Sequence, residues 1–206
     1  MSEAIIHVVD DDASFRTALV RLLRTEGYAV RAYASVGEVL IEPECSAPGC
    51  FILDVNMPGP TGIELQIALA RRADPPPVIF LSGYLDVPTT VAAMKLGAVD
   101  FLTKPIDRAK LVATVEGALV ADRAARERRS GERTFRVRFE SLSDRDRSVF
   151  DRVTAGLPNR EIAEQLGIAE RTVKLHRARV MERLGARTVP ELVRMADRLA
   201  ADGSER

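Results

Sequence analysis

The sequence predicts a doubly wound α/β domain with a five-stranded parallel sheet, followed by an all-α domain of four helices that contains a helix-turn-helix. Three observations lead to this prediction. Over the first 120 residues, short apolar runs alternate with segments of helical periodicity. From Ser141 onward the pattern is helical throughout. The formal net charge of zero also divides between the parts: residues 1–122 hold 10 basic and 16 acidic residues (net −6), and residues 123–206 hold 20 and 14 (net +6).

Five segments in the first part have the composition of buried parallel strands. Each is short and apolar, because a parallel strand covered by helices buries both of its faces. The predicted strands are 5–9, 28–34, 50–55, 78–82 and 99–103, and the predicted helices lie near 15–27, 36–41, 63–72, 87–96 and onward from about 107.

Polar side chains stand at the carboxyl ends of four predicted strands. Asp10 and Asp11 follow the first strand, Asp54 ends the third, Ser82 ends the fourth and Lys104 follows the fifth. The carboxyl ends of parallel strands share one edge of the sheet, so we expect these side chains to converge. Each of them alone has a simple explanation as a turn or cap residue. Their occurrence together at the correct strand ends favours a functional site.

The residue types at this edge indicate phosphoryl chemistry. Three crowded carboxylates repel one another unless a cation lies among them. Oxygen donors without His or Cys suit a hard ion, and Mg²⁺ takes one or two carboxylates together with water and phosphate oxygens. Lys104 would supply a compact positive charge and Ser82 a hydroxyl donor. A nucleophilic Asp54 beside these groups would suit transfer of a phosphoryl group onto a carboxylate.

These residues lie in motifs that resemble the receiver domain of two-component response regulators. The motifs are Val-Val-Asp-Asp at 8–11, Leu-Asp-Val-Asn-Met-Pro at 53–58, Leu-Ser-Gly at 81–83 and Asp-Phe-Leu-Thr-Lys-Pro at 100–105. The resemblance implies the CheY-like, flavodoxin-like form of the doubly wound fold. It also implies that Asp54 is a phospho-acceptor served by a sensor histidine kinase.

The resemblance assigns further roles around Asp54. It implies that Asp11 and Asp54 ligate Mg²⁺ directly, with the backbone carbonyl of Asn56, while Asp10 acts through water. It implies that Lys104 and Ser82 bind the phosphoryl oxygens, and that Phe101 turns inward when Ser82 moves. Families of this kind often have a cis peptide bond between the lysine and the proline that follows it, here at 104–105.

The segment 121–138 is rich in Arg, Ala and Glu and leaves two interpretations open. It is either a solvated tether or a long signalling helix that continues the last receiver helix. Gly131 weakens a helix, and Phe135, Val137 and Phe139 alternate as in a strand. We therefore divide the chain into a receiver domain at 1–120, a linker at 121–138 and a DNA-binding domain at 139–206.

The final domain contains a short helix, a glycine turn at Gly167 and a basic amphipathic helix. This order is typical of a helix-turn-helix, whose second helix fits the major groove of DNA. Small helical bundles also present basic faces, so the pattern alone leaves a purely structural bundle open. The residues expected to contact DNA are Asn159, Arg160, Arg171, Thr172, Lys174, Leu175, His176 and Arg179, with His176 also expected to pack inside the domain.

Motifs at 142–146, 156–163 and 171–176 resemble the LuxR-type DNA-binding domain. Together with the receiver motifs they make the chain similar to FixJ/NarL-type response regulators. The resemblance implies a transcriptional regulator that is not an enzyme and that binds double-stranded promoter DNA as a phosphorylation-induced dimer. RNA polymerase is a further candidate partner. No apolar stretch is long enough to cross a membrane, so we expect a cytoplasmic protein.

Two alternatives belong to other functional classes. A phosphatase or dehalogenase-like enzyme would also use an aspartate nucleophile, but it would want a second aspartate two residues later, where this chain has Asn56. It would also need a substrate cap, and the loops are short. A regulator whose C-terminal helices bind a protein instead of DNA would lack the steep salt dependence of DNA binding.

Overall fold

The computed structural model describes residues 4–42, 47–83 and 87–203, with side chains described as far as residue 197. The chain forms two compact units, one ending at Arg126 and one beginning at Glu127. Their division falls within the predicted linker 121–138. Across the described residues, none of the helices combines the length and hydropathy that a membrane crossing requires.

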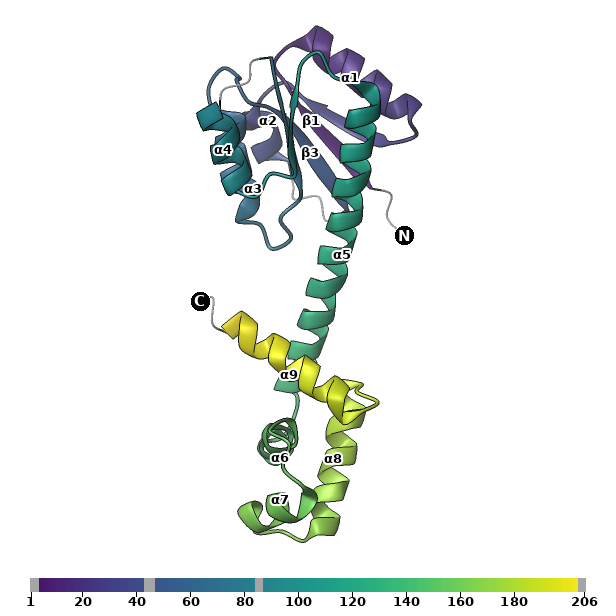
Figure 1. Ribbon diagram of the computed structural model, residues 1–206, viewed down its shortest axis with the longest axis vertical. Coiled ribbons are helices and arrows are strands. Elements are labelled where there is room, and N and C mark those ends of the chain that lie inside the picture. Colours follow the sequence, from purple (N-terminus) through teal and green to yellow (C-terminus); the bar gives the residue numbers. More distant parts are fainter. Residues whose placement is uncertain (1–3, 43–46, 84–86, 204–206) are drawn as a thin grey trace. The chain divides into compact units, whose positions relative to one another are not determined.

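The N-terminal unit is a parallel sheet with strand order β2-β1-β3-β4-β5. Figure 1 shows helices on both sides of this sheet. This confirms the predicted doubly wound class, and the predicted strand ends differ from the observed ones by at most one residue. The elements are β1 (Ile5–Val9), α1 (Ala13–Thr25), β2 (Ala29–Tyr33), α2 (Val36–Ile41), β3 (Gly49–Asp54), α3 (Gly62–Ala70), β4 (Val78–Ser82), α4 (Val87–Lys95), β5 (Asp100–Thr103) and α5 (Arg108–Glu140).

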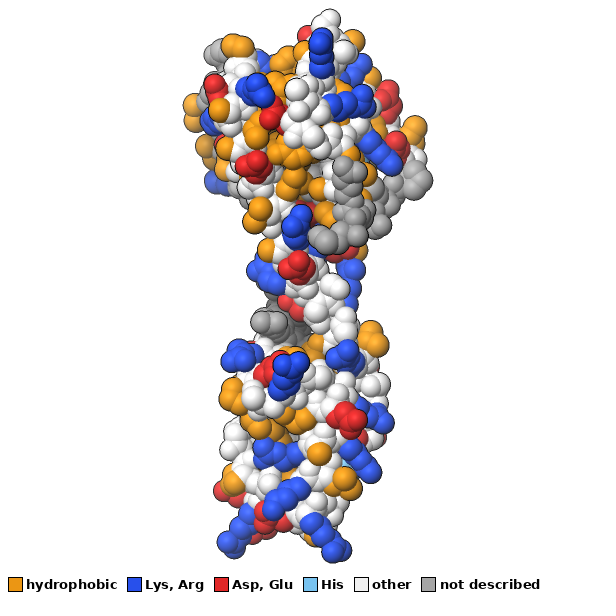
Figure 2. Space-filling view, turned by 90° about the vertical axis from the view of Figure 1, so that its right-hand side faces the viewer, with side chains coloured by type: hydrophobic (Ala, Val, Ile, Leu, Met, Phe, Trp, Pro, Cys, Tyr) orange, Lys and Arg blue, Asp and Glu red, His pale blue; other side chains and the backbone are white. Residues whose placement is uncertain are grey.

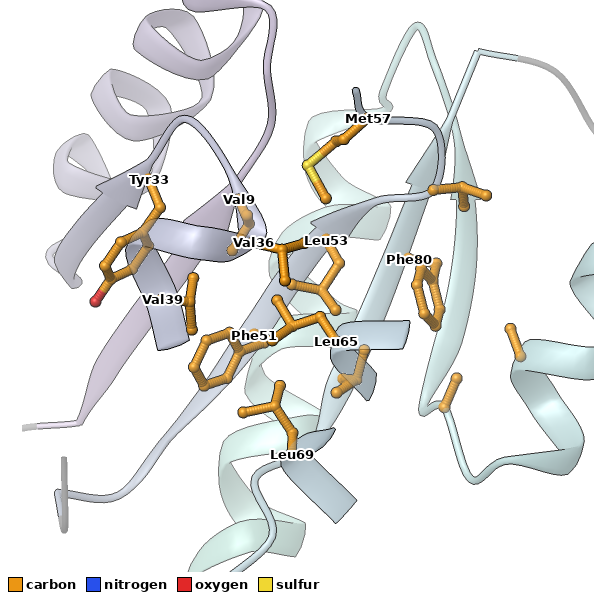
Figure 3. Packing of buried hydrophobic residues seen from close by; sticks show 14 residues of the cluster. Val9, Tyr33, Val36, Val39, Phe51, Leu53, Met57, Leu65, Leu69 and Phe80 are labelled. Carbon is orange, nitrogen blue, oxygen red and sulfur yellow. The ribbon is translucent and has the colours of Figure 1, made fainter. Parts of the chain in front are cut away.

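Helices cover both faces of this sheet, which explains why the central strands are apolar throughout. All six residues of β3 and all five of β4 are buried. One face packs on α2, α3 and α4 (Figure 3), through side chains that include Val36, Phe51, Leu53, Leu65 and Phe80. The opposite face packs on α1 and α5, through Ile52, Leu23, Ile79, Leu111 and Val115.

Local contacts define the chain just after β1 and β3. Asp12 caps α1, because its Oδ1 accepts hydrogen bonds from the backbone N–H groups of Ser14 (2.9 Å) and Phe15 (3.1 Å). Thr61 and Glu64 form a capping box at the start of α3. A Cβ atom on Gly62 would lie 2.2 Å from the carbonyl oxygen of Asp54, so only glycine lets α3 begin this close to the end of β3.

Helix α5 runs without interruption through the predicted linker, including Gly131. The strand-like interpretation of Phe135, Val137 and Phe139 is therefore wrong. Phe135 and Phe139 are four residues apart on one face of the helix, with ring centroids 6.3 Å apart, while Val137 is exposed. The spacing of these three residues is compatible with a strand, which has period 2, and with a helix, in which residues four apart share a face. The burial of Phe135 and the exposure of Val137 identify the helix.

The C-terminal unit contains the end of α5 together with α6 (Asp144–Thr154), α7 (Asn159–Leu166), α8 (Glu170–Leu184) and α9 (Val189–Gly203). Its core includes Phe135, Val149, Ile162, Val173 and Leu192. Glycines with positive φ end α7 (Gly167, 63°) and α8 (Gly185, 73°). Helices α7 and α8, joined by the turn at Gly167, form the predicted helix-turn-helix.

Candidate functional site

A cluster of carboxylates lies at the carboxyl edge of the sheet, between β1 and β3, where the strand order reverses. Asp10 directly follows β1 and is 1% exposed, and Asp54 is the last residue of β3 and 7% exposed. Asp11 is exposed to solvent. One carboxylate oxygen of each of these three residues lies within 4.8 Å of the others. The predicted convergence of these side chains is therefore present in the structure.

Lys104 reaches this cluster from the end of β5. Its Nζ lies 2.7 Å from Asp10 Oδ2 and 3.1 Å from Asp54 Oδ1. The same Nζ lies 4.0 Å from the ring centroid of Phe15, which is a cation–π contact. The backbone N–H of Lys104 donates to the carbonyl of Ser82 (2.8 Å), and the peptide bond to Pro105 is cis. The lysine is therefore held by its backbone as well as by its side chain.

Among the described residues, Lys104 is the only cation that forms an ion pair with the carboxylates of this cluster. Burial raises the pKa of Asp54; the nearby Lys104 acts in the opposite direction, and Asp10 and Asp11 add to the rise. Burial alone would lower the pKa of Lys104, but its hydrogen bonds and ion pairs with Asp10 and Asp54 outweigh this and raise it. One lysine thus faces three carboxylates. A divalent cation would offset the remaining repulsion.

The other predicted receiver residues lie around this cluster at different depths. Ser82 is the last residue of β4 and is 1% exposed. Phe101 is partly buried and packs on the core, with its ring centroid 6.2 Å from that of Phe80. Asn56 is exposed, two residues after Asp54. Ser82 and Asn56 therefore flank the cluster from the ends of β4 and β3.

Two residues beside this cluster were missed by the sequence interpretation. Phe15 contacts Lys104, and Arg16 donates from Nη1 to the backbone carbonyl of Asp10 at 2.5 Å. Both lie in the first turns of α1, directly after the acidic residues that end β1. Their proximity in sequence was available as a hint, but only the path of the chain shows which side chains turn back toward the rim.

The second candidate site is the outer face of α8. Arg171, Lys174 and Arg179 are exposed, and Leu175 is 50% exposed. Lys174 Nζ lies 3.6 Å from Glu170, a pair that is largely in solvent and therefore weak. Figure 2 shows Lys and Arg side chains spread over the visible face of this unit, the lower one in the picture. The remaining predicted contacts are Asn159 and Arg160 at the start of α7 and Thr172 in the first turn of α8.

His176 is partly buried, with 15% of its side chain exposed. Its Nδ1 lies 2.7 Å from Oδ1 of Asp146, whose Oδ2 accepts a hydrogen bond from the hydroxyl of Ser143, also at 2.7 Å. Burial alone would raise the pKa of Asp146, but the hydrogen bonds with His176 and Ser143 outweigh this and lower it. His176 thus links α8 to the start of α6, in keeping with its expected packing role.

The fold and these sites define a regulator in which a signal-receiving α/β domain is joined to a DNA-binding helix-turn-helix domain. Two family descriptions match the chain: "Response regulator receiver domain" over residues 6–116 and "Bacterial regulatory proteins, luxR family" over residues 140–196. The chain belongs to the two-component response regulators of the FixJ/NarL type.

Individual relatives align along most of the chain. Nodulation protein W of Bradyrhizobium diazoefficiens is 41% identical over 198 residues, which cover 96% of this chain and 87% of that protein. Transcriptional regulatory protein FixJ of Azorhizobium caulinodans is 42% identical over 193 residues, covering 93% and 90%. The solved structure of the response regulator StyR has a TM-score of 0.83 at 37% identity and covers 96% of this chain and 100% of its own.

The family resolves the functional alternatives. This chain is a transcriptional regulator and not an enzyme of the phosphatase or dehalogenase kind. Its receiver domain implies a histidine kinase as partner, and its LuxR-type domain implies DNA binding, which replaces the alternative of a purely protein-binding bundle.

Proposed function

We propose that Asp54 accepts a phosphoryl group from a histidine kinase. A carboxylate oxygen of Asp54 attacks the phosphorus, the bond between phosphorus and the kinase histidine breaks, and an aspartyl phosphate forms. The supporting observation is the position of Asp54 at the end of β3, with Lys104 Nζ 3.1 Å from its Oδ1 and oxygens of Asp10 and Asp11 within 4.8 Å.

Mg²⁺ fits the chemistry of this cluster, because every side-chain donor is a carboxylate oxygen and the cluster has an excess of negative charge. Asp11, Asp54 and the backbone carbonyl of Asn56 would hold the ion directly, and Asp10 through water. When bound, the ion neutralises charge on the phosphoryl oxygens. Lys104 would then shift its ion pairs toward the incoming oxygens, because its side chain is flexible and already within reach.

Ser82 and Phe101 would carry the phosphorylation state away from Asp54. Ser82 and the backbone of Lys104 are joined by a hydrogen bond between the ends of β4 and β5. A Ser82 hydroxyl drawn toward a phosphoryl oxygen would vacate space that the ring of Phe101 could enter. The conformational change would therefore appear along α4 and β5.

This face carries apolar side chains suited to a dimer. Val87 (66% exposed), Val91 (45%) and Met94 (43%) lie on one side of α4, and Val99 (39%) lies just before β5. Exposed apolar groups gathered on one helix are typical of interaction surfaces. Phosphorylation would favour pairing of two copies through this face, and a dimer would read two DNA half-sites.

The DNA contacts divide by chemistry. Arg171, Lys174 and Arg179 would contact phosphates or guanine edges, and Leu175 would contact a thymine methyl group. Asn159, Arg160 and Thr172 would contact phosphates from the beginnings of α7 and α8, with His176 at the edge of the same surface.

Phosphorylation of Asp54→Asn with Mg²⁺ and a phosphodonor tests the acceptor. We expect complete loss of the acid-stable, base-labile label. Asp12→Asn is the matched control, because Asp12 is on the same edge but caps α1, and asparagine caps equally well. The control should be labelled as the wild type is. A label that persists in Asp54→Asn would assign the acceptor elsewhere.

Lys174→Ala tests the recognition helix. Binding to duplex DNA should weaken, and the slope of log K against log salt should fall by about 0.9 for one lost phosphate contact. Arg194→Ala removes an equal charge from an exposed position on α9 and should leave the slope nearly unchanged. Equal effects of the two changes would indicate general electrostatics in place of a groove contact.

A further inference from the structure

We propose that Arg177 is a positioning residue in DNA recognition, which orients the amide of Asn159 so that its NH₂ group faces a DNA phosphate. This inference rests on the proposed phosphate contact of Asn159. The supporting contact is a hydrogen bond of 2.5 Å from Arg177 Nη1 to Asn159 Oδ1.

The hydrogen bond connects the two helices of the helix-turn-helix. Asn159 is the first residue of α7, and Arg177 lies in the middle of α8, 18 residues later. Both side chains are partly buried. The ion pairs Arg160–Glu164 and Lys174–Glu170, in contrast, stay within one helix and are largely exposed. The hydrogen bond between Arg177 and Asn159 therefore connects the recognition helix α8 to the preceding helix α7.

The chemistry of the two groups determines which end of the amide is free. A guanidinium group has five N–H donors and no acceptor, so only the oxygen of the Asn159 amide can face it. The Nδ2 of Asn159 must therefore point away from Arg177. Among the described residues, Asn159 makes no side-chain hydrogen bond other than the one to Arg177.

The two N–H groups on Nδ2 of Asn159 can donate to an anionic acceptor such as a phosphate, but they cannot bind a cation or another hydrogen-bond donor. The residue before α7, Pro158, is exposed and offers no side-chain cap. Arg160 beside Asn159 is also exposed and contributes positive charge to the same end of α7. An amide in the opposite orientation would present its oxygen to the phosphate and be repelled. Without Arg177, the amide would be free to rotate and would lose much of its binding contribution.

The test is a double-mutant cycle on the full-length chain, with Arg177→Met and Asn159→Ala, singly and together. A random-sequence duplex is a sufficient probe, because phosphate contacts carry no sequence information. Each single change should weaken binding roughly tenfold, as expected for one hydrogen bond to a charged group. The double variant should bind no more weakly than the single ones, because Arg177 acts through Asn159.

Two further variants separate positioning from direct contact and from misfolding. Arg177→Lys retains a donor and no acceptor, so it should recover most of the lost affinity. Asn159→Asp keeps an acceptor for Arg177 but presents no donor to DNA. It should therefore bind at least as weakly as Asn159→Ala, while the thermal unfolding of the helical unit stays unchanged or shifts upward.

Several outcomes would overturn the inference. If Arg177→Met causes the same loss with and without the Asn159→Ala change, and lowers the salt slope by about 0.9, then Arg177 contacts a phosphate itself. Wild-type affinity of Asn159→Asp would also contradict it. If Asn159→Ala has no effect while Lys174→Ala weakens binding, the inference fails and the recognition helix stands. If neither change weakens binding, the proposed DNA surface itself is wrong.

Discussion

Each unit of this protein buries an aspartate against a side chain from a distant part of the chain, but in the receiver unit several carboxylates share one cation. In the receiver unit, Lys104 is shared by Asp10 and Asp54, with Asp11 nearby. In the helical unit, a single buried aspartate, Asp146, meets one histidine and one serine hydroxyl.

The difference separates a cluster in which carboxylates crowd around one lysine from a contact in which hydrogen bonds stabilise a single buried aspartate. The pKa of Asp54 is raised, because burial and its acidic neighbours disfavour the ionised form. The ionised Asp54 therefore lowers the stability of the folded receiver unit. The pKa of Asp146 is lowered, so its ionised form is favoured by the hydrogen bonds it accepts. Substitutions at the two aspartates should therefore change stability in opposite directions.

The largest expected effect is the loss of stability in Asp146→Ala. Removing this carboxylate leaves His176 and the Ser143 hydroxyl without their buried partner, which should cost the helical unit about 3 kcal/mol. Asp151→Ala, at an exposed position on the same helix, should cost less than about 0.5 kcal/mol. Hydrogen exchange of the α8 backbone N–H groups at increasing denaturant concentration measures the free energy of unfolding of the helical unit. Equal losses of stability in Asp146→Ala and Asp151→Ala would mean that the contacts of Asp146 do not stabilise the helical unit.

Lys104→Met should destabilise the receiver unit by about 2 kcal/mol in the presence of a chelator, because it removes the cation that is ion-paired with both Asp10 and Asp54. Mg²⁺ should restore most of this loss, since the carboxylates stay in place. The chain has no tryptophan and its three tyrosines all precede Arg126, so tyrosine fluorescence reports on the receiver unit. Lys95→Met, exposed on α4, is the control and should change little.

The residues of the receiver rim were predictable from the sequence, because a parallel sheet brings strand ends together whatever the details of its packing. Asp10, Asp54 and Lys104 each directly follow or end an apolar strand, and the predicted strand ends match the observed ones to within one residue. The contact of Phe15 with Lys104 was not predictable in this way. It depends on the direction in which α1 leaves the rim, which the sequence pattern does not contain.

The helical unit shows a second limit of sequence reasoning. Phe135 and Phe139 belong to its core, yet the division into domains at residue 139 placed Phe135 in the linker. Composition there is dominated by arginine, and two apolar residues among so many charges look like a tether. Their role is visible only once α6 and α8 supply the surface on which they pack, including an edge-to-face contact of Phe139 with Phe150.

Asp54→Asn should stabilise the receiver unit by on the order of 1 kcal/mol in a chelator, the opposite sign to a change at Asp146. The amide removes one of three crowded charges and fills nearly the same volume. Stabilisation by Mg²⁺ should shrink at the same time, because a proposed ligand is lost. A destabilised Asp54→Asn, measured by tyrosine fluorescence with urea, would mean that Lys104 already balances the cluster.

The smallest effect is the difference in pH dependence between the two aspartates. For Asp54 the folded pKa lies above the ordinary 3.8, so the cost of its charge is present at neutral pH and disappears as the pH falls through that raised value. The stability gained by Asp54→Asn should therefore begin to fall as the pH drops through the raised value and should be lost by the time the pH reaches 3.8.

For Asp146 the folded pKa lies below 3.8, so its contribution is present above 3.8 and is lost only as the pH falls below it. The stability deficit of Asp146→Asn should persist to more acidic conditions than the gain in Asp54→Asn. His7, whose pKa burial lowers to about 4, also makes the receiver less stable in acid, but it does so in wild type and variant alike and cancels in the difference. Denaturation of the wild type and of each variant across this pH range measures where the two stability differences disappear. If both disappear over the same pH range, the two carboxylates have similar surroundings despite their different partners.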